Sequence, residues 1–195
     1  MLFTLKRTWV GGVLGLVVLA LLGFGLRRLL GTGAAAKPLP AAAVLGVAAF
    51  AVVLSSDVLL HGLFLVLFGE PYRRRHRELA EVFRGQTAAA ILAGALMAGC
   101  GEELVFRGLG TGPAYLVAAA VAFGLLHQFR RSLWPFTVWA MWQGLILGAA
   151  LWWTGNLLVP MVAHFLHDLT GFLIFRHLNR RPGLAKSADP GVVPG

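Results

Sequence analysis

Most of the 195-residue chain consists of apolar blocks about 20 residues long, separated by short polar or glycine- and proline-containing connections. About 20 residues of α-helix cross a bilayer core about 30 Å thick, because each residue advances the helix by about 1.5 Å. Hydrophobic residues make up 58% of the sequence and charged residues 13%, a balance that soluble domains do not have. The sequence therefore predicts an all-α fold, a polytopic transmembrane helical bundle with about six spans.

The predicted spans cover about residues 9–26, 41–68, 87–108, 114–127, 133–153 and 157–175, and we expect the first to be retained rather than cleaved as a signal peptide. Five arginines within residues 70–86 surround a few apolar residues, a pattern typical of an amphipathic helix at the lipid headgroups. We divide the chain into residues 1–86 (two transmembrane helices and this interfacial helix), 87–178 (the core with the functional residues) and 179–195 (a basic, disordered tail).

Basic residues at the ends of the apolar blocks set the predicted orientation. With the N-terminus inside, the inner segments hold thirteen of the 17 basic residues: Lys6, Arg7, Arg73, Arg74, Arg75, Arg77, Arg84, Arg130, Arg131, Arg176, Arg180, Arg181 and Lys186. The positive-inside rule then places both termini in the cytoplasm. The net charge of +9 reflects this orientation and contact with the anionic lipid bilayer, and we expect no nucleic-acid partner.

Two adjacent acids, Glu102 and Glu103, lie near the end of the third predicted span. A charge at the centre of a membrane helix costs about 2.5–3.5 kcal/mol by insertion scales, so packing alone does not explain the pair. Glu103 and Arg107 are four residues apart and can pair on one helical face. Glu102 points about 100° away and lacks that partner. We therefore expect Glu103 to be structural and Glu102 to be available as a general base.

Two further patterns place histidines in other spans: Phe123-x-x-x-His127 in the fourth and His164-x-x-x-Asp168 in the sixth. At about 1.5 Å per residue, Glu102 and His164 both lie about 10 Å from the face on which the third helix ends and the sixth begins. His127 comes out deeper, at about 20 Å. The sequence therefore associates Glu102 with His164 more closely than with His127.

Other polar residues in the spans leave alternatives open. Asp57 and His61 share a helical face and are expected to pair with each other or face a polar cavity, with a part in substrate entry or proton handling as the alternative. We expect Gln143 to form a hydrogen bond between helices and Cys100 to be a small apolar filler. His167 is an alternative to His164 as the site histidine. We favour His164 because Asp168 follows it at i+4.

Glu102-Glu103-x-x-x-Arg107, Phe123-x-x-x-His127 and His164-x-x-x-Asp168 resemble the EExxxR, FxxxH and HxxxN/D signatures of the CPBP family. These CAAX-processing and bacteriocin-processing (Abi) proteins are intramembrane endopeptidases. The resemblance covers about residues 87–175, with the motifs in the family's order. It implies hydrolysis of a peptide bond near the C-terminus of a lipid-modified or membrane-anchored protein.

The resemblance also implies roles for the motif residues. Glu102 and His127 would activate a water, His164 and residue 168 would stabilise the oxyanion, and Glu103 and Arg107 would fix the geometry. Many members have Asn where this chain has Asp168. We therefore expect Asp168 to orient His164 and hold it protonated, which makes His164 the main oxyanion donor.

The family is described both as metalloproteases and as metal-independent glutamate proteases. Glu102, His127 and His164 could ligate Zn, but the chain has no HExxH helix, and we favour hydrolysis without a metal or other cofactor. The predicted orientation places the site on the outer face, as in myxosortase-like bacterial relatives, which implies the bacterial inner (plasma) membrane. The alternatives are a non-enzymatic bacteriocin-immunity or scaffold protein and a small proton-coupled transporter.

Overall fold

The computed structural model describes residues 38–82, 84–128 and 134–178, together with the isolated residues 18, 21 and 25. The elements from residue 38 onward are α2 (Leu39–Val82), α3 (Ala88–Met97), the π-helix η1 (Ala98–Glu102), α4 (Glu103–Phe106), α5 (Pro113–Leu126), α6 (Trp134–Thr154) and α7 (Leu158–Leu178). The predicted all-α fold is confirmed for this part of the chain. The first predicted span lies largely outside the described residues and the tail 179–195 entirely so; the count of about six spans therefore stays a prediction.

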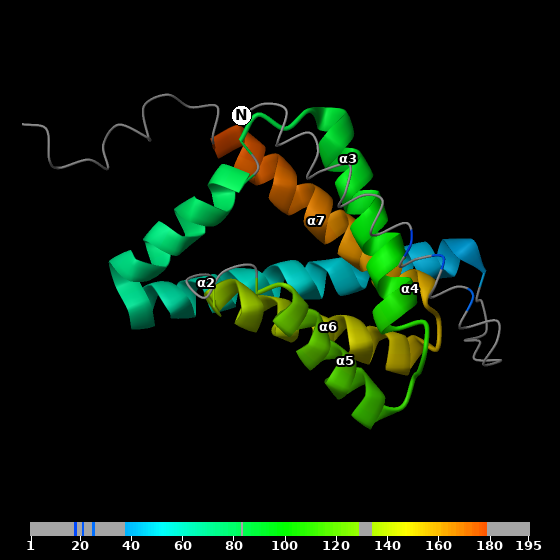
Figure 1. Ribbon diagram of the computed structural model, residues 1–195. Coiled ribbons are helices and arrows are strands. Elements are labelled where there is room, and N and C mark those ends of the chain that lie inside the picture. The colour runs from blue at the N-terminus through cyan, green and yellow to red at the C-terminus, as the bar shows by residue number, and fades with distance from the viewer. Residues whose placement is uncertain are drawn as a thin grey trace, which may run out of the picture.

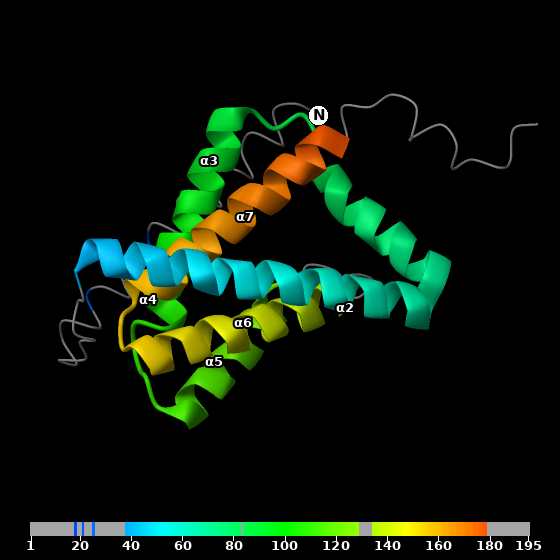
Figure 2. The same ribbon diagram turned by 180° about the vertical axis from the view of Figure 1, so that it is seen from behind.

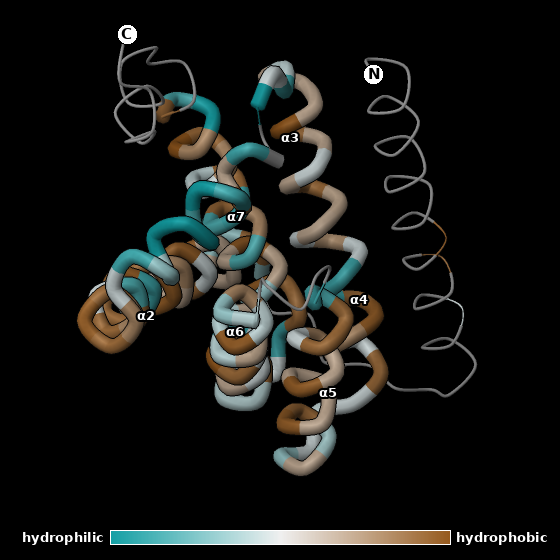
Figure 3. The backbone as a smooth tube through the Cα atoms, turned by 60° about the vertical axis from the view of Figure 1, so that its left-hand side comes forward, coloured by the Kyte–Doolittle hydropathy of each residue, from teal (hydrophilic) through white to brown (hydrophobic). Residues whose placement is uncertain are grey.

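Four of the described helical stretches are long and apolar enough to cross a membrane: Leu39–Glu81, Ala88–Phe106, Trp134–Thr154 and Leu158–Leu178. Pro113–Leu126 is apolar but shorter. Large apolar side chains face outward, with Val66 83% and Trp153 86% exposed. In Figure 3 the helices are mostly pale or brown, and hydrophilic stretches gather near α4 and along part of α2. Length, composition and apolar outer faces are those expected of helices in a bilayer.

Helix α2 has two limbs that meet at a sharp turn (Figures 1 and 2). The turn is at Gly69, whose φ of 53° and ψ of −129° lie in a region that residues with a side chain rarely adopt, and Pro71 follows it. The long limb, residues 39–68, corresponds to the second predicted span. The short limb, residues 70–82, corresponds to the predicted basic interfacial helix and carries exposed ion pairs such as Glu70 with Arg77.

Helix α7 is the central element and packs against α2, α3, η1 and α6, while α5 packs against α6. Val53, Leu147 and Ala163 form a core cluster where α2, α6 and α7 meet. A Cβ on Gly46 of α2 would lie only 2.6 Å from Val162 Cβ of α7. The small side chains therefore allow these helices to approach closely, as in other membrane bundles.

The chain from α3 through η1 to α4 forms one column beside α7 (Figure 1). Thr87 caps α3, because its Oγ1 accepts a hydrogen bond from Ala90 N at 3.1 Å. A Cβ on Gly99 of η1 would lie 2.8 Å from the backbone nitrogen of Phe165 in α7. Only glycine permits this approach, which places the two glutamates that follow it against α7.

Candidate active site

Glu103 and Arg107 form the buried ion pair that their spacing predicts. Arg107 Nη1 donates to Glu103 Oε1 at 2.8 Å, and Nη2 donates to the carbonyl oxygen of Gly144 in α6 at 3.1 Å. The arginine side chain is 1% exposed and that of Glu103 is 0% exposed. A Cβ on Gly144 would lie 3.2 Å from Arg107 Nη2 and 3.0 Å from Ala120 Cβ of α5. The glycine thus admits both the guanidinium and the neighbouring helix.

Glu103 also orients His164 of α7. His164 Nδ1 lies 2.8 Å from Glu103 Oε1, so this nitrogen carries a proton and donates it to the carboxylate. The nearest Asp168 oxygen is 3.7 Å from His164 Nε2, beyond hydrogen-bond distance. Asp168 is therefore an ion-pair partner of His164 without a hydrogen bond, and its predicted role in orienting the ring stays a prediction. The tight contact between η1 and α7 brings Glu103 to the ring, where it supplies a hydrogen bond that the spacing did not predict.

The two motif histidines converge on Glu102. His127 Nδ1–H donates to the carbonyl oxygen of Phe123 at 2.7 Å, which turns Nε2 toward the glutamate. His127 Nε2 and His164 Nε2 both lie 3.9 Å from Glu102 Oε2. This oxygen is buried and has no hydrogen-bond partner among the described residues. One unsatisfied carboxylate oxygen thus faces two imidazoles from two other helices.

The predicted depth difference between His127 and Glu102 is wrong. The estimate assumed that α4 ends and α5 begins at the same level of the bundle. The chain instead continues past the end of α4 before α5 begins (Figures 1 and 2). His127 follows the last residue of α5, and its longer path from this displaced start brings it level with Glu102.

Phe123 is the apolar centre of the site. It is 2% exposed, and its ring centroid lies 4.3 Å from that of His127 and 5.8 Å from that of His164. The Arg107 guanidinium carbon lies 4.9 Å from the same centroid, within the range of a cation–π contact. The first residue of the FxxxH pattern therefore packs against members of all three motifs.

Asp57 does not pair with His61. It is bound instead by Trp139 and Gln143 of α6 and by His167 of α7. Gln143 therefore makes the predicted contact between helices, and His167 faces α2 while the other motif histidine faces the site. The indole of Trp139 was not predicted as a partner, since an aromatic residue in an apolar helix gives no such signal.

His61 pairs across the Gly69 turn. Its Nδ1 lies 2.8 Å from the hydroxyl oxygen of Tyr72 in the short limb of α2. The prediction that His61 and Asp57 satisfy each other failed because the turn folds the short limb back onto the long one. Cys100, predicted to fill a gap in the core, is exposed. It lies in η1, whose wider turn changes which residues face inward.

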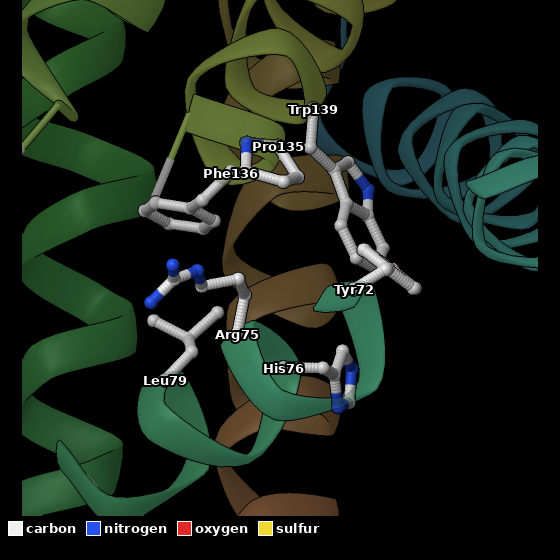
Figure 4. Close-up of a pocket in the computed structure, with 7 residues that line it drawn as sticks. All are labelled: Tyr72, Arg75, His76, Leu79, Pro135, Phe136 and Trp139. Carbon is white, nitrogen blue, oxygen red and sulfur yellow. The ribbon is translucent and has the colours of Figure 1, made fainter. Parts of the chain in front are cut away.

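A small pocket separates the short limb of α2 from the start of α6 (Figure 4). Its lining residues are Tyr72, Arg75, His76, Leu79, Pro135, Phe136 and Trp139. The ring of Phe136 also packs against His127, with centroids 5.9 Å apart. The pocket is thus next to the site but does not contain its carboxylates.

Glu102, His127 and His164 were predicted as the ligands of a zinc ion, if one is bound. Atoms bound to one tetrahedral zinc lie about 3.3 Å apart, given metal–ligand distances of about 2.0–2.1 Å. The two Nε2 atoms are each 3.9 Å from Glu102 Oε2, and no group of three His, Cys, Asp or Glu side chains in the described ranges is spaced to hold a metal ion. The donors converge, but in this structure they lie farther apart than the ligands of a bound zinc ion.

Glu102 places its buried Oε2 between two histidines, on helices apolar enough to span a membrane, and ionisable residues at such positions mark functional sites. Comparison with known proteins finds a matching family model. Residues 84–170 match the family model described as type II CAAX prenyl endopeptidase Rce1-like. The resemblance to the CPBP family is thereby confirmed over a segment that contains all three motifs. The matching family is a membrane-embedded protease family, and the apolar helices identify an integral membrane protein.

The chain is also similar to a curated bacterial protein. It is 33% identical over 88 residues to "Uncharacterized protein YpbD" of Bacillus subtilis (strain 168). The alignment covers 45% of this chain and 47% of YpbD, so the chain spans about half the length of this relative. No solved structure matches the chain.

Proposed function

We propose that the protein is an intramembrane endopeptidase in which Glu102 activates the water that attacks a peptide carbonyl. The observation that carries this proposal is the position of Glu102 Oε2, which is buried, lacks a hydrogen-bond partner in the described part of the chain, and lies 3.9 Å from two imidazole nitrogens. That distance is too long for a direct hydrogen bond and suits a bridging water. The family match supports peptide-bond hydrolysis.

In the proposed reaction, Glu102 Oε2 accepts one proton of the water, and His127 Nε2 accepts a hydrogen bond from the other O–H. The water oxygen attacks the carbonyl carbon of the scissile bond and forms a tetrahedral oxyanion. Collapse of this intermediate breaks the C–N bond, and Glu102 returns its proton to the leaving amine. The products are a new carboxyl terminus and a new amino terminus.

His164 is proposed to stabilise the oxyanion. Its Nδ1–H is held by Glu103, which is itself held by Arg107. As an imidazolium, His164 then presents Nε2–H to the developing negative charge. A donor that is fixed before the reaction begins stabilises that charge without reorganisation. Glu103 and Arg107 therefore act as positioning residues.

The proposed substrate is a membrane-anchored or lipid-modified protein cleaved near its C-terminus. The matching family is described as a CAAX prenyl endopeptidase, which supports a lipid-bearing C-terminal segment. The distribution of basic residues supports cytoplasmic termini and a site that opens outward. Similarity to a bacterial protein supports a bacterial inner membrane. Labelling of cysteines placed at 110 and 155 by a membrane-impermeant reagent tests this orientation, and labelling only from the cytoplasmic side contradicts it.

The direct test is cleavage of candidate membrane-anchored substrates by purified protein, comparing wild type with Glu102→Gln and His164→Ala. Both variants are expected to lose cleavage. Glu78→Gln, an equivalent change in a glutamate paired with Arg75 on the short limb of α2, serves as the matched control and is expected to retain it. Wild-type rates in both site variants would refute the proposal. Absence of cleavage in folded wild-type protein would favour the non-enzymatic alternatives.

We propose that hydrolysis proceeds without a metal, because Glu102, His127 and His164 are not spaced as zinc ligands. Cleavage should therefore persist after dialysis against EDTA. Loss of activity in EDTA that added Zn²⁺ restores would contradict this part of the proposal and leave the assignment of an endopeptidase intact.

A further inference from the structure

A second buried polar cluster lies beside the candidate active site and joins α2, α6 and α7. Asp57 of α2 is 5% exposed and accepts hydrogen bonds from Trp139 Nε1–H and, at 3.1 Å, from Gln143 Nε2–H. His167 of α7 places its Nε2 2.5 Å from Asp57 Oδ2. A buried carboxylate is costly unless it is paired and hydrogen-bonded, and this one has partners from two other helices.

His167 connects this cluster to the active site. Its other ring nitrogen, Nδ1, lies 3.1 Å from Asp168 Oδ1, and Asp168 Oδ2 faces His164 Nε2 at 3.7 Å. As an imidazolium, His167 donates one N–H to each of the two carboxylates. Gln143 Nε2 lies 2.8 Å from His167 Nε2, and because both nitrogens are donors here they share Asp57 Oδ2 as their acceptor and do not bond each other. Each oxygen of Asp168 thus faces a different histidine.

The side chains form one row that alternates in charge type between acidic and basic. In order from α2 to α4, its members are Asp57, His167, Asp168, His164, Glu103 and Arg107. The exposed fraction of these side chains does not exceed 17%. Apolar residues of similar volume would pack as stably as buried ion pairs do, so stability alone does not explain the row. The row instead has the geometry expected if each side chain fixes the orientation of the next.

We infer that Asp57 and His167 are positioning residues of the active site. Asp57 fixes the His167 ring, the ring holds Asp168 Oδ1, and Asp168 Oδ2 is thereby directed at His164. This inference rests on the proposed function. It extends the site to α2, which lies before the segment 84–170 that matches the family model. Through its contact with His164, the Asp168 carboxylate balances the charge of the imidazolium that binds the oxyanion.

The first test is a double-mutant cycle on cleavage with Asp57→Asn, His167→Gln and the double variant. Loss of a side chain that supports a directly acting residue typically costs about 10–100-fold, and we expect this loss in kcat with little change in KM. Because both residues act through one contact, the double variant should be no slower than the slower single variant. Wild-type kcat in the single variants, or losses that multiply, would overturn the inference.

Ser56→Ala is the matched control for this cycle. Ser56 precedes Asp57 on α2, and its hydroxyl donates only within the helix, to Val53 O at 2.7 Å. This variant should cleave at the wild-type rate. If Asp57→Asn fails to fold, Trp139→Phe removes one hydrogen bond to the same carboxylate and is expected to give a smaller loss of kcat in the same direction.

The second test does not require activity. Protein labelled with ¹⁵N-histidine in detergent micelles gives ring nitrogen signals that His164→Ala and His167→Gln assign. Asp57→Asn should shift the signals of both histidines, although His167 is the one of the two that Asp57 contacts, and Ser56→Ala should shift neither. An unchanged His164 signal would overturn the inference. This readout also separates the positioning role of Asp57 and His167 from the proposed endopeptidase function, since it remains decisive if wild-type protein cleaves nothing.

Discussion

Two acids of the bundle, Asp57 and Glu102, differ in how their oxygens are satisfied. Both oxygens of Asp57 have partners, supplied by α6 and α7. Glu102 Oε2 is buried with no hydrogen-bond partner in the part of the chain that the structure describes. Buried polar atoms are nearly always hydrogen-bonded, so an unsatisfied carboxylate oxygen that faces two imidazoles marks a place where a reacting molecule is expected. In the proposed mechanism Asp57 supports the scaffold and Glu102 takes part in the chemistry.

The largest expected effect separates these two acids by activity. Glu102→Gln should lower kcat by about 10²–10⁴-fold, the usual contribution of general acid–base catalysis. Asp57→Asn should lower it less, because Asp57 acts only through His167. Single-turnover cleavage of one substrate by both variants measures the difference. A greater loss in Asp57→Asn than in Glu102→Gln would reverse the assignment of roles.

The next effect is on stability. Arg107→Leu leaves Glu103 buried without its cation, and breaking a buried pair in this way costs about 3–5 kcal/mol of unfolding free energy. Chemical unfolding in mixed micelles measures the loss. Adding Glu103→Leu removes the unpaired charge and should recover part of it. If Arg107→Leu unfolds like wild type, the pair does not hold the site together.

A smaller effect tests the contact between η1 and α7. Gly99→Ala places a methyl group 2.8 Å from backbone and side-chain atoms of Phe165, and such overpacking costs about 1–3 kcal/mol. The shift should also move Glu102 away from the histidines and slow cleavage. Gly62→Ala in α2 is the matched control, because no atom lies within 4 Å of the added Cβ. Equal behaviour of the two variants would show that the close approach is unimportant.

The smallest effect is expected on the short limb of α2. Arg77 pairs with Glu70, but both side chains are more than half exposed. Exposed ion pairs contribute little, because water and salt screen them. Arg77→Ala should leave both the unfolding midpoint and the rate of cleavage unchanged. A clear loss of activity in Arg77→Ala would show that the short limb contributes to the site. The contrast between Asp57 and Glu102 would then be less informative.

The sequence was sufficient wherever the determining interactions are local. Apolar blocks of the right length predicted the described helices from residue 39 onward, and the i,i+4 spacing predicted the pair of Glu103 and Arg107. The separation of the two glutamates follows from the same helical period. The convergence of the three motifs was inferred from the family resemblance.

The sequence did not predict the partner of a side chain that can pair either locally or with a residue far along the chain. Asp57 and His61 satisfy the spacing rule, yet the partners of Asp57 lie 82, 86 and 110 residues away. That choice depends on how α2 packs against α6 and α7, which no short window of sequence encodes. The depth of His127 failed for a related reason, since it depends on the path of the connection after α4. The glycines at 99 and 101, poor helix formers, were the only local sign of irregular backbone at η1.

The π-helical turn of η1 makes the site sensitive to chain length. Its wider turn accommodates one residue more than an α-helical path from α3 to α4 would need. Each residue turns an α-helix by about 100°, so in a regular α-helix this extra residue would rotate Glu103 and Arg107 together away from His164, whereas the wide turn absorbs it. A second residue inserted between 98 and 102 would exceed what the turn absorbs and would rotate both side chains. The number of residues between α3 and the two glutamates that follow it is therefore constrained, as well as their identity.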